Sequence, residues 1–158
     1  MAGKKLGYNA KMWVKAGETD TTADISGAAP ASATEWTHVQ DVSFDDTYSE
    51  VDATTRRMAG AKAYIPGLRD ISLTVPHLKD TDDAAVDIVN TAMTGRTVIT
   101  VWILDGPVDS ADSEGIAFVA HVFGGTEGQE LDSAVNKSLT IKPADSQYAP
   151  AAITNTIT

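Results

Sequence analysis

The sequence lacks cysteine and any long run of apolar residues. With no cysteine among its 158 residues, the chain offers no disulfide framework, no thiolate nucleophile and no cysteine-ligated zinc site. No window approaches the length that a membrane-spanning helix needs, and the basic residues at the start are not followed by an apolar run. We therefore expect a chain that is made and kept in the cytoplasm and that gains its stability from packing and association.

Positive charge and aromatic residues are scarce. The chain has 12 lysines and arginines against 22 aspartates and glutamates, a net charge of −10, whereas a protein that grips nucleic acid by its phosphates needs the opposite balance. An acidic surface is compatible with solubility alone, and equally with a conduit through which DNA passes without sticking. Aromatic residues make up 6% of the chain, and most occupy core-like positions, which disfavours a carbohydrate-binding face.

Motifs that carry chemistry are also missing. The histidines are far apart and show no metal-ligand spacing, so we predict structural roles for His38, His77 and His121. The glycine-rich stretch at 124–128 is not followed by the lysine of a phosphate-binding loop, and no nucleophile elbow or acid–base pair of carboxylates stands out. We predict a turn at 124–128, no catalytic residue, no metal site and no cofactor, and we do not expect an enzyme.

Alternation of apolar and polar residues predicts strands. The predicted strands span residues 6–15, 36–46, 71–75, 97–104, 116–123 and 131–142. The runs at 97–104 and 116–123 are apolar on both sides, which is typical of central strands. The alternation at 36–46 is imperfect, which a bulge or a two-sided environment explains. Residues 50–63 alternate as an exposed hairpin does, and Pro66 and Gly67 predict a turn after it.

One convincing helix is predicted after residue 80. The side-chain oxygens of residues 80–83 cap its free amide groups, and Gly95 ends it. Its apolar face, at spacings of three and four, comprises Ala85, Ile88, Val89, Ala92 and Met93. The elements together predict a mainly β fold with one helix (α+β). We expect an antiparallel β-sandwich or partly closed barrel of six to seven strands with one flanking helix, in a single domain over residues 1–158.

Three segments have too little apolar surface to pack by themselves: a long loop at about 16–35, an extended ribbon at about 48–66 and a C-terminal arm at about 143–158. The loop is either a contact arm or disordered, and the arm is either frayed or docked on a neighbour. An exposed ribbon invites pairing with another chain. The candidate subunit contacts are Glu50, Asp52, Arg56, Arg57 and Tyr148. For the two arginines, ion pairs with another subunit and ordinary solvation are equally open.

The segments follow one another in a characteristic order. An opening strand and a Ser/Thr/Ala-rich loop ending at Trp36 precede the acidic pair Asp45 and Asp46. Then follow Glu50 to Arg57, Gly67 to Val75, the Asp-capped helix, Val98 to Gly106, and Gly115 to Phe123. From about residue 6 to residue 142, this layout resembles the tail tube proteins (major tail proteins) of long-tailed, non-contractile bacteriophages.

The resemblance implies a β-sandwich or barrel with one helix that assembles into six-membered rings. The inner strands would join into a β-lined channel, the rings would stack into a tail tube, and phage DNA would pass through the lumen without specific binding. The implied partners are further copies of the chain and the tape-measure, tail terminator and baseplate proteins, with no cofactor and no membrane. The chain would be part of the virion tail and be synthesised in the host cytoplasm. Candidate lumen-facing acids are Asp41, Asp45 and Asp46, which lie on a predicted strand with polar alternation.

Two alternatives stay open. The first is the inner tube of a contractile injection or secretion machine, which shares the fold and ring size by resemblance. The second is a monomeric β-sandwich binding module for carbohydrate or adhesion, which needs exposed aromatic residues on one face.

Overall fold

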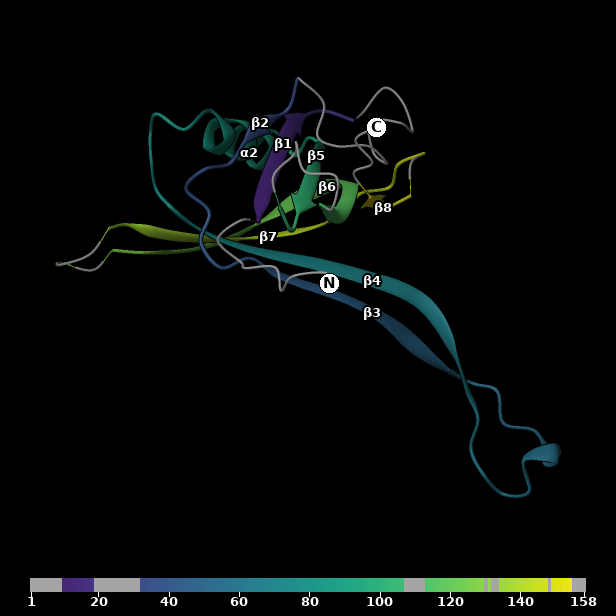
Figure 1. The fold of residues 1–158 in the computed structure, drawn as a ribbon. Coiled ribbons are helices and arrows are strands. Elements are labelled where there is room, and N and C mark those ends of the chain that lie inside the picture. Colours follow the sequence, from purple (N-terminus) through teal and green to yellow (C-terminus); the bar gives the residue numbers. More distant parts are fainter. Residues whose placement is uncertain are drawn as a thin grey trace, which may run out of the picture.

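The computed structural model describes residues 10–18, 32–106, 113–129, 131, 134–147 and 149–154. These residues form eight β-strands, one α-helix and a short 3₁₀ turn (Figure 1). In chain order the elements are β1 (Lys11–Ala16), β2 (Thr34–Glu35), β3 (Ser43–Asp52), the 3₁₀ turn (Arg56–Met58), β4 (Tyr64–Leu78), α2 (Ala84–Gly95), β5 (Ile99–Leu104), β6 (Glu114–Gly128), β7 (Asn136–Pro143) and β8 (Ala151–Thr154). The prediction of a mainly β fold with one helix is confirmed, with eight strands in place of six or seven.

The strands form one antiparallel sheet in the order β2-β1-β5-β6-β7-β4-β3, with β8 paired to β6. Strand β6 joins two halves of this sheet, because its residues 115–120 pair with β5 and its residues between 120 and 128 pair with β7. Figure 1 shows the half with β1 and β5 above the half with β7, β4 and β3. Over the residues that the structure describes, the sheet does not close. The expected sandwich is therefore a single open sheet that folds over at β6.

The core lies between the two half-sheets and the helix. From Ile71 to Leu78, β4 alternates buried and half-buried side chains, because one side of the strand faces the core. The buried side chains from both half-sheets and α2 meet in one cluster, which includes Met12, Val14, Leu73, Val75, Val89, Val101, Phe118, Leu139 and Ile141. On β1 and β7, the side chains that point into this core are thus two residues apart, as strand geometry requires.

Strand β5 is buried on both sides, as predicted for a central strand. Ile99 and Val101 face the main core, whereas Trp102 and Leu104 face a second apolar cluster with Ala117 and Val119 of β6. A half-solvated strand would carry polar side chains on one of these sides. The pairing of β5 with β1 on one side and β6 on the other places it in the interior of the sheet.

The helix starts and ends where predicted. The Asp83 side chain accepts a hydrogen bond of 2.9 Å from the Ala85 backbone amide and so caps the first turn. The predicted apolar face is confirmed, and Val86 is a further buried residue that the prediction missed. Gly95 is the last residue of the helix, and Arg96 after it takes the left-handed conformation, at φ 54°.

The predicted strand at 36–46 is wrong in its first half. Strand β3 begins at Ser43, and the preceding residues form only an isolated bridge between Val39 and His77. The reason is the spacing of the buried side chains. Trp36 is buried against the His77 ring, and Val39 packs on the same core three residues later, which a two-residue strand period does not allow.

Two predicted turns are strand instead. Pro66 and Gly67 lie in β4 opposite the end of β3, where β4 carries one extra residue and the register shifts. A bulge accommodates the missing amide of proline, and a Cβ on Gly67 would clash with the Ser49 side chain. Residues 124–128 continue β6, although the register shifts between Val122 and Gly125. A Cβ on Gly125 would clash with the backbone carbonyl of Ser138, so glycine permits the close approach of β7.

The predicted loop at 16–35, the last predicted strand and the C-terminal arm each differ in part from expectation. The end of the predicted loop forms β2, which pairs with β1, while residues 19–31 lie outside the described part. The predicted strand at 131–142 begins at Asn136. The C-terminal arm was expected to fray or to dock on a neighbour, but β8 pairs with residues 114–117 of β6 in the same chain. The residues before 10 and after 154 lie outside the described part.

Candidate assembly surfaces

Strands β3 and β4 form a ribbon that leaves the body of the molecule. All of β3 is exposed, and β4 is almost fully exposed from Tyr64 to Asp70. Figure 1 shows this ribbon projecting away from the rest of the sheet, with the 3₁₀ turn at its tip. At about 3.3 Å per residue, the seven residues from Tyr64 to Asp70 carry the ribbon roughly 23 Å beyond the core. The exposed hairpin predicted around residues 50–63 is confirmed and is longer than expected.

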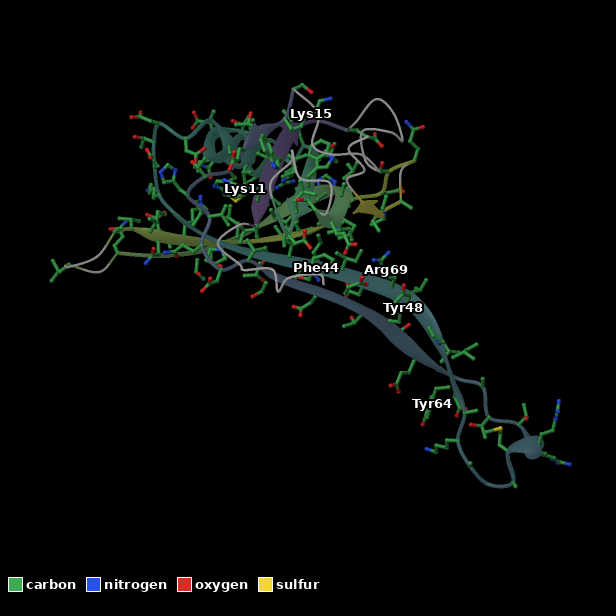
Figure 2. All side chains as sticks on the ribbon, in the orientation of Figure 1. Lys11, Lys15, Phe44, Tyr48, Tyr64 and Arg69 are labelled. Carbon is green, nitrogen blue, oxygen red and sulfur yellow. The ribbon has the colours of Figure 1, made fainter. Side chains whose placement is uncertain are left out.

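The ribbon carries large apolar side chains into solvent. The exposed members are Phe44, Tyr48, Val51, Met58, Tyr64, Ile65 and Leu68. Leu68 is 85% exposed, which is extreme for a leucine in a strand. Figure 2 shows Phe44, Tyr48 and Tyr64 spaced along the ribbon. A two-stranded ribbon with apolar side chains on its surface is marginally stable alone and is typical of a protein–protein contact.

The half-sheet that contains the ribbon has one polar face. Residues directly opposite each other in an antiparallel pair share a face, and Leu73 fixes the core side. The opposite side, which we call the hydroxyl face, carries Ser43, Asp45, Thr47, Asp70, Ser72, Thr74, Pro76, Leu78, His121, Thr126, Asn136, Ser138, Thr140 and Lys142. Seven of these fourteen side chains are hydroxyls, two are acids, and the basic residues are Lys142 and His121.

The three predicted lumen-facing acids do not share one surface. Asp45 lies on the hydroxyl face, whereas Asp46, its neighbour along the strand, points to the opposite side. Asp46 binds Arg69 through two hydrogen bonds of 2.7 and 2.6 Å, and this guanidinium lowers the pKa of the Asp46 carboxyl. Asp41 precedes β3 and lines a groove at the base of the ribbon. Asp70, which the sequence prediction did not include, joins Asp45 on the hydroxyl face.

Four of the five predicted subunit contacts lie together on the ribbon. Glu50 and Asp52 are exposed on β3, and Arg56 and Arg57 are exposed in the 3₁₀ turn at the tip. The Asp52 carboxylate accepts a hydrogen bond of 2.8 Å from the Thr54 amide, and hydrogen bonds from Thr54 lower the pKa of Asp52. This bond orders the start of the tip. Tyr148, the fifth candidate, lies outside the described residues.

Sequence reasoning missed the apolar part of the ribbon. Tyr64, Ile65 and Leu68 flank the residues that were interpreted as a turn, so their exposure on a strand was not expected. The alternation that would have revealed them is interrupted by the bulge near Gly67. A signal was present in the composition, because residues 64–68 combine three large apolar side chains with no charge.

The groove at the base of the ribbon has a volume of about 960 Å³. Its lining comes from the segment before β3 and from β1, β2, β5 and β6, so no local sequence motif marks it. Met12, Trp36 and Ile103 give it an apolar floor. The acids around it are Glu35, Asp41, Asp105 and Glu114, and the base is Lys11, whose ammonium lies 2.6 Å from Glu35.

The histidines take structural positions. His38 Nδ1 lies 3.0 Å from the buried Asp83 carboxylate, and its Nε2 lies 3.4 Å from Asp80. The hydrogen bond to Asp83 raises the pKa of His38, whereas burial lowers the pKa of His77. Within the part of the chain that the structure describes, no group of three His, Asp or Glu side chains is placed to hold a metal ion. No helix there is long and apolar enough to span a membrane.

Comparison with known proteins identifies the fold. No protein-family model and no curated protein matches the sequence. The SPP1 tail tube matches with a TM-score of 0.73 at 15% identity, over 98% of this chain and 81% of that chain. The tail of an empty gene transfer agent particle, refined with C6 symmetry, matches with a TM-score of 0.67 at 10% identity, over 90% and 96%. The 6-fold symmetrised baseplate of the anti-feeding prophage matches with a TM-score of 0.60 at 6% identity, over 92% and 95%.

These likenesses extend over nearly the whole chain, the ribbon included. At such low identity they establish a shared fold, which is the fold of tail tube structures. The resemblance found in the sequence is confirmed at that level.

Proposed function

We propose that this chain is a tail tube subunit that assembles with its own copies into stacked hexameric rings around a hollow bore, through which phage DNA passes into the host. The observation that carries the proposal is the β3–β4 ribbon, which exposes seven large apolar side chains beyond the core of the single chain. A surface of this kind is stable when neighbouring copies cover it. The fold supports the same conclusion, because the similar tail of the gene transfer agent particle has C6 symmetry.

The half-sheet formed by the end of β6 with β7, β4 and β3, which we call the lower half-sheet, has strand edges that support a ring. Strand β3 ends the sheet order on one side, and on the other side residues 121–128 of β6 pair only with β7 among the described strands. A strand edge offers unpaired amide and carbonyl groups to another strand. When β3 of one copy lies beside β6 of the next, the contact is head-to-tail, and a head-to-tail contact closes into a ring or propagates.

The hydroxyl face is then the wall of the bore. Asp45 and Asp70 repel phosphate, and the serines and threonines between them are uncharged. Lys142 and His121, which lie opposite each other on β7 and β6, are the basic residues in the described part of this face. Such a wall lacks the clustered positive charge that holds nucleic acid in place, so DNA slides along it. Glu50, Asp52, Arg56, Arg57 and Tyr148 stay candidate contacts between subunits.

This function places the chain in the virion tail after its synthesis in the host cytoplasm. Tape-measure, tail terminator and baseplate proteins are its expected partners, and it needs no catalytic residue or cofactor. A second candidate is the inner tube of a contractile injection machine. The likeness to the anti-feeding prophage baseplate favours it, at a lower TM-score of 0.60.

Negative-stain electron microscopy of concentrated purified protein tests the proposal. We expect uniform hollow tubes whose end views show six subunits around a central hole, with smaller species on dilution. Discrete globules at every concentration, even after addition of a tail initiation complex, would contradict a tail tube subunit. Tubes that require a contractile sheath protein would support the second candidate.

A further inference from the structure

We propose that the basic tip of the ribbon, residues 53–63, binds in the acidic groove of another copy of this chain. This inference rests on the proposed function and deepens it, because it assigns the contact that joins one copy to the next along the assembly.

The tip is a positively charged segment of an acidic chain. Residues 53–63 contain Arg56, Arg57 and Lys62 and no acidic residue, although the whole chain has a net charge of −10. All three basic residues are exposed, as is Met58 beside them. Ala59 follows at φ 49° and turns the chain tightly, so both arginines sit at the outermost point of the ribbon. The tip thus offers three positive charges and one apolar side chain.

The groove offers the complement. Four acids against one lysine leave it with three negative charges around a floor that includes Met12, Trp36 and Ile103. Lys11 is bound to Glu35, and the lining also contains the acids Asp41, Asp105 and Glu114. The Asp105 carboxylate also accepts a hydrogen bond of 2.7 Å from the Glu114 amide, which fixes this wall. A volume of about 960 Å³ is large enough for a turn with two or three side chains.

The tip cannot reach the groove of its own chain. Phe44 at the base of β3 lines the groove, whereas the tip lies at the far end of the ribbon, roughly 23 Å beyond the core. Figure 1 shows the ribbon leading away from the body with the 3₁₀ turn at its outer end. Complementary charge and separated positions together point to a contact between copies.

Charge reversal tests the contact. We expect Arg57→Glu to raise the protein concentration needed for tube formation by at least about tenfold, because it places like charges in the groove. Asp41→Lys should have the same effect. The variant that carries both substitutions should form tubes at a concentration close to that of the unchanged protein. Lys15→Glu is the matched control, because Lys15 lies on β1 outside both surfaces and should leave the threshold close to that of the unchanged protein. Circular dichroism checks that each variant is folded.

The absence of cysteine allows a second test by cross-linking. An Arg57→Cys protein and an Asp41→Cys protein are assembled together and treated with a short bifunctional maleimide. We expect a cross-linked dimer from the mixture and none from either protein alone. A cross-link within one chain between Gly3→Cys and Asp41→Cys, without the mixed dimer, would show that residues 1–9 occupy the groove and would overturn the inference.

The outcomes separate this inference from the proposed function. If the unchanged protein forms no tubes, the tail tube function fails. If it forms tubes and Arg57→Glu forms them at the same concentration, the function stands and the tip–groove contact is wrong. Loss of assembly in both single variants with no recovery in the combined variant would also contradict a direct contact.

Discussion

Strand β4 has two halves with opposite surroundings. From Ile71 to Leu78 every second side chain is buried in the core, whereas from Tyr64 to Asp70 almost all side chains are exposed. The inner half pairs with β7 from Leu73 to Leu78 and with β3 up to Thr74, whereas the outer half pairs with β3 alone. The two halves therefore differ in backbone pairing as well as in the burial of apolar surface. The body packs within the single chain, whereas the described residues of the ribbon are largely exposed to solvent.

The difference between the buried and exposed halves of β4 is tested most directly by making the same substitution in each half. Leu73 is fully buried and Leu68 is 85% exposed. Leu73→Ala should lower the free energy of unfolding by about 2–5 kcal/mol, because it leaves a cavity in the core. Leu68→Ala should change it by less than about 0.5 kcal/mol and should instead weaken tube formation. Urea denaturation measures the free energy of unfolding, and electron microscopy measures tube formation. A large loss of stability in Leu68→Ala would show that the outer half of β4 also supports the fold.

A second substitution tests how closely the strands of the lower half-sheet approach. Gly125→Ala places a methyl group against the Ser138 carbonyl and should lower the free energy of unfolding by about 1–3 kcal/mol. Gly128→Ala in the same strand is the matched control, because nothing lies within 4 Å of its added Cβ. Thermal unfolding of both variants measures the difference. Equal effects would mean that strand propensity, and not the close approach, sets the cost.

A smaller effect concerns the pH dependence of stability. It comes from the hydrogen bond between His38, in the segment before β3, and Asp83, which caps the helix. The hydrogen bond to Asp83 raises the pKa of His38 above its ordinary 6.5, so the folded chain holds this proton more tightly than the unfolded chain. The stabilisation is fully present below that value and is lost as pH rises through the folded pKa. His38→Gln should therefore reduce stability more at about pH 5 than at about pH 8.

Denaturation curves of His38→Gln and of the unchanged protein at both pH values check the sign. His77 acts in the opposite direction, because burial lowers its pKa and its protonation favours the unfolded chain. Subtracting the two proteins at each pH removes the contribution of His77. A difference that is larger at high pH would show that the bond between His38 and Asp83 does not stabilise the charged histidine.

The sequence predicted those parts of the fold whose signal is local. The cap at Asp83, the apolar stripe of the helix and the two-sided burial of β5 each depend on residues within a few positions of one another. Strand boundaries failed where a bulge or a close backbone approach let proline or glycine remain in a strand, as at Pro66 and Gly125. Local propensity assigns such residues to turns, and only the partner strand reveals otherwise.

The candidate surfaces were predictable only in part. The exposed ribbon follows from composition. Arg56 and Arg57, which were predicted as subunit contacts, lie in the 3₁₀ turn at its tip, and their contacts stay a prediction. The opposite orientation of Asp45 and Asp46 follows from strand geometry, but it required the correct start of β3. The groove brings together residues from distant segments, and Glu35 and Glu114 line it together only because β2, β1, β5 and β6 lie side by side.

The continuity of β4 has a mechanical consequence. In an assembly joined through the ribbon, tension applied at the tip travels along an unbroken covalent backbone into Leu73 and Val75, which are both fully buried. These anchors resist the pull simultaneously, so the subunit yields by sliding a whole packed strand and not by peeling apart one contact after another. In the proposed tube, each copy would therefore resist tension through its packed strand while keeping an ordinary, modestly stable interior.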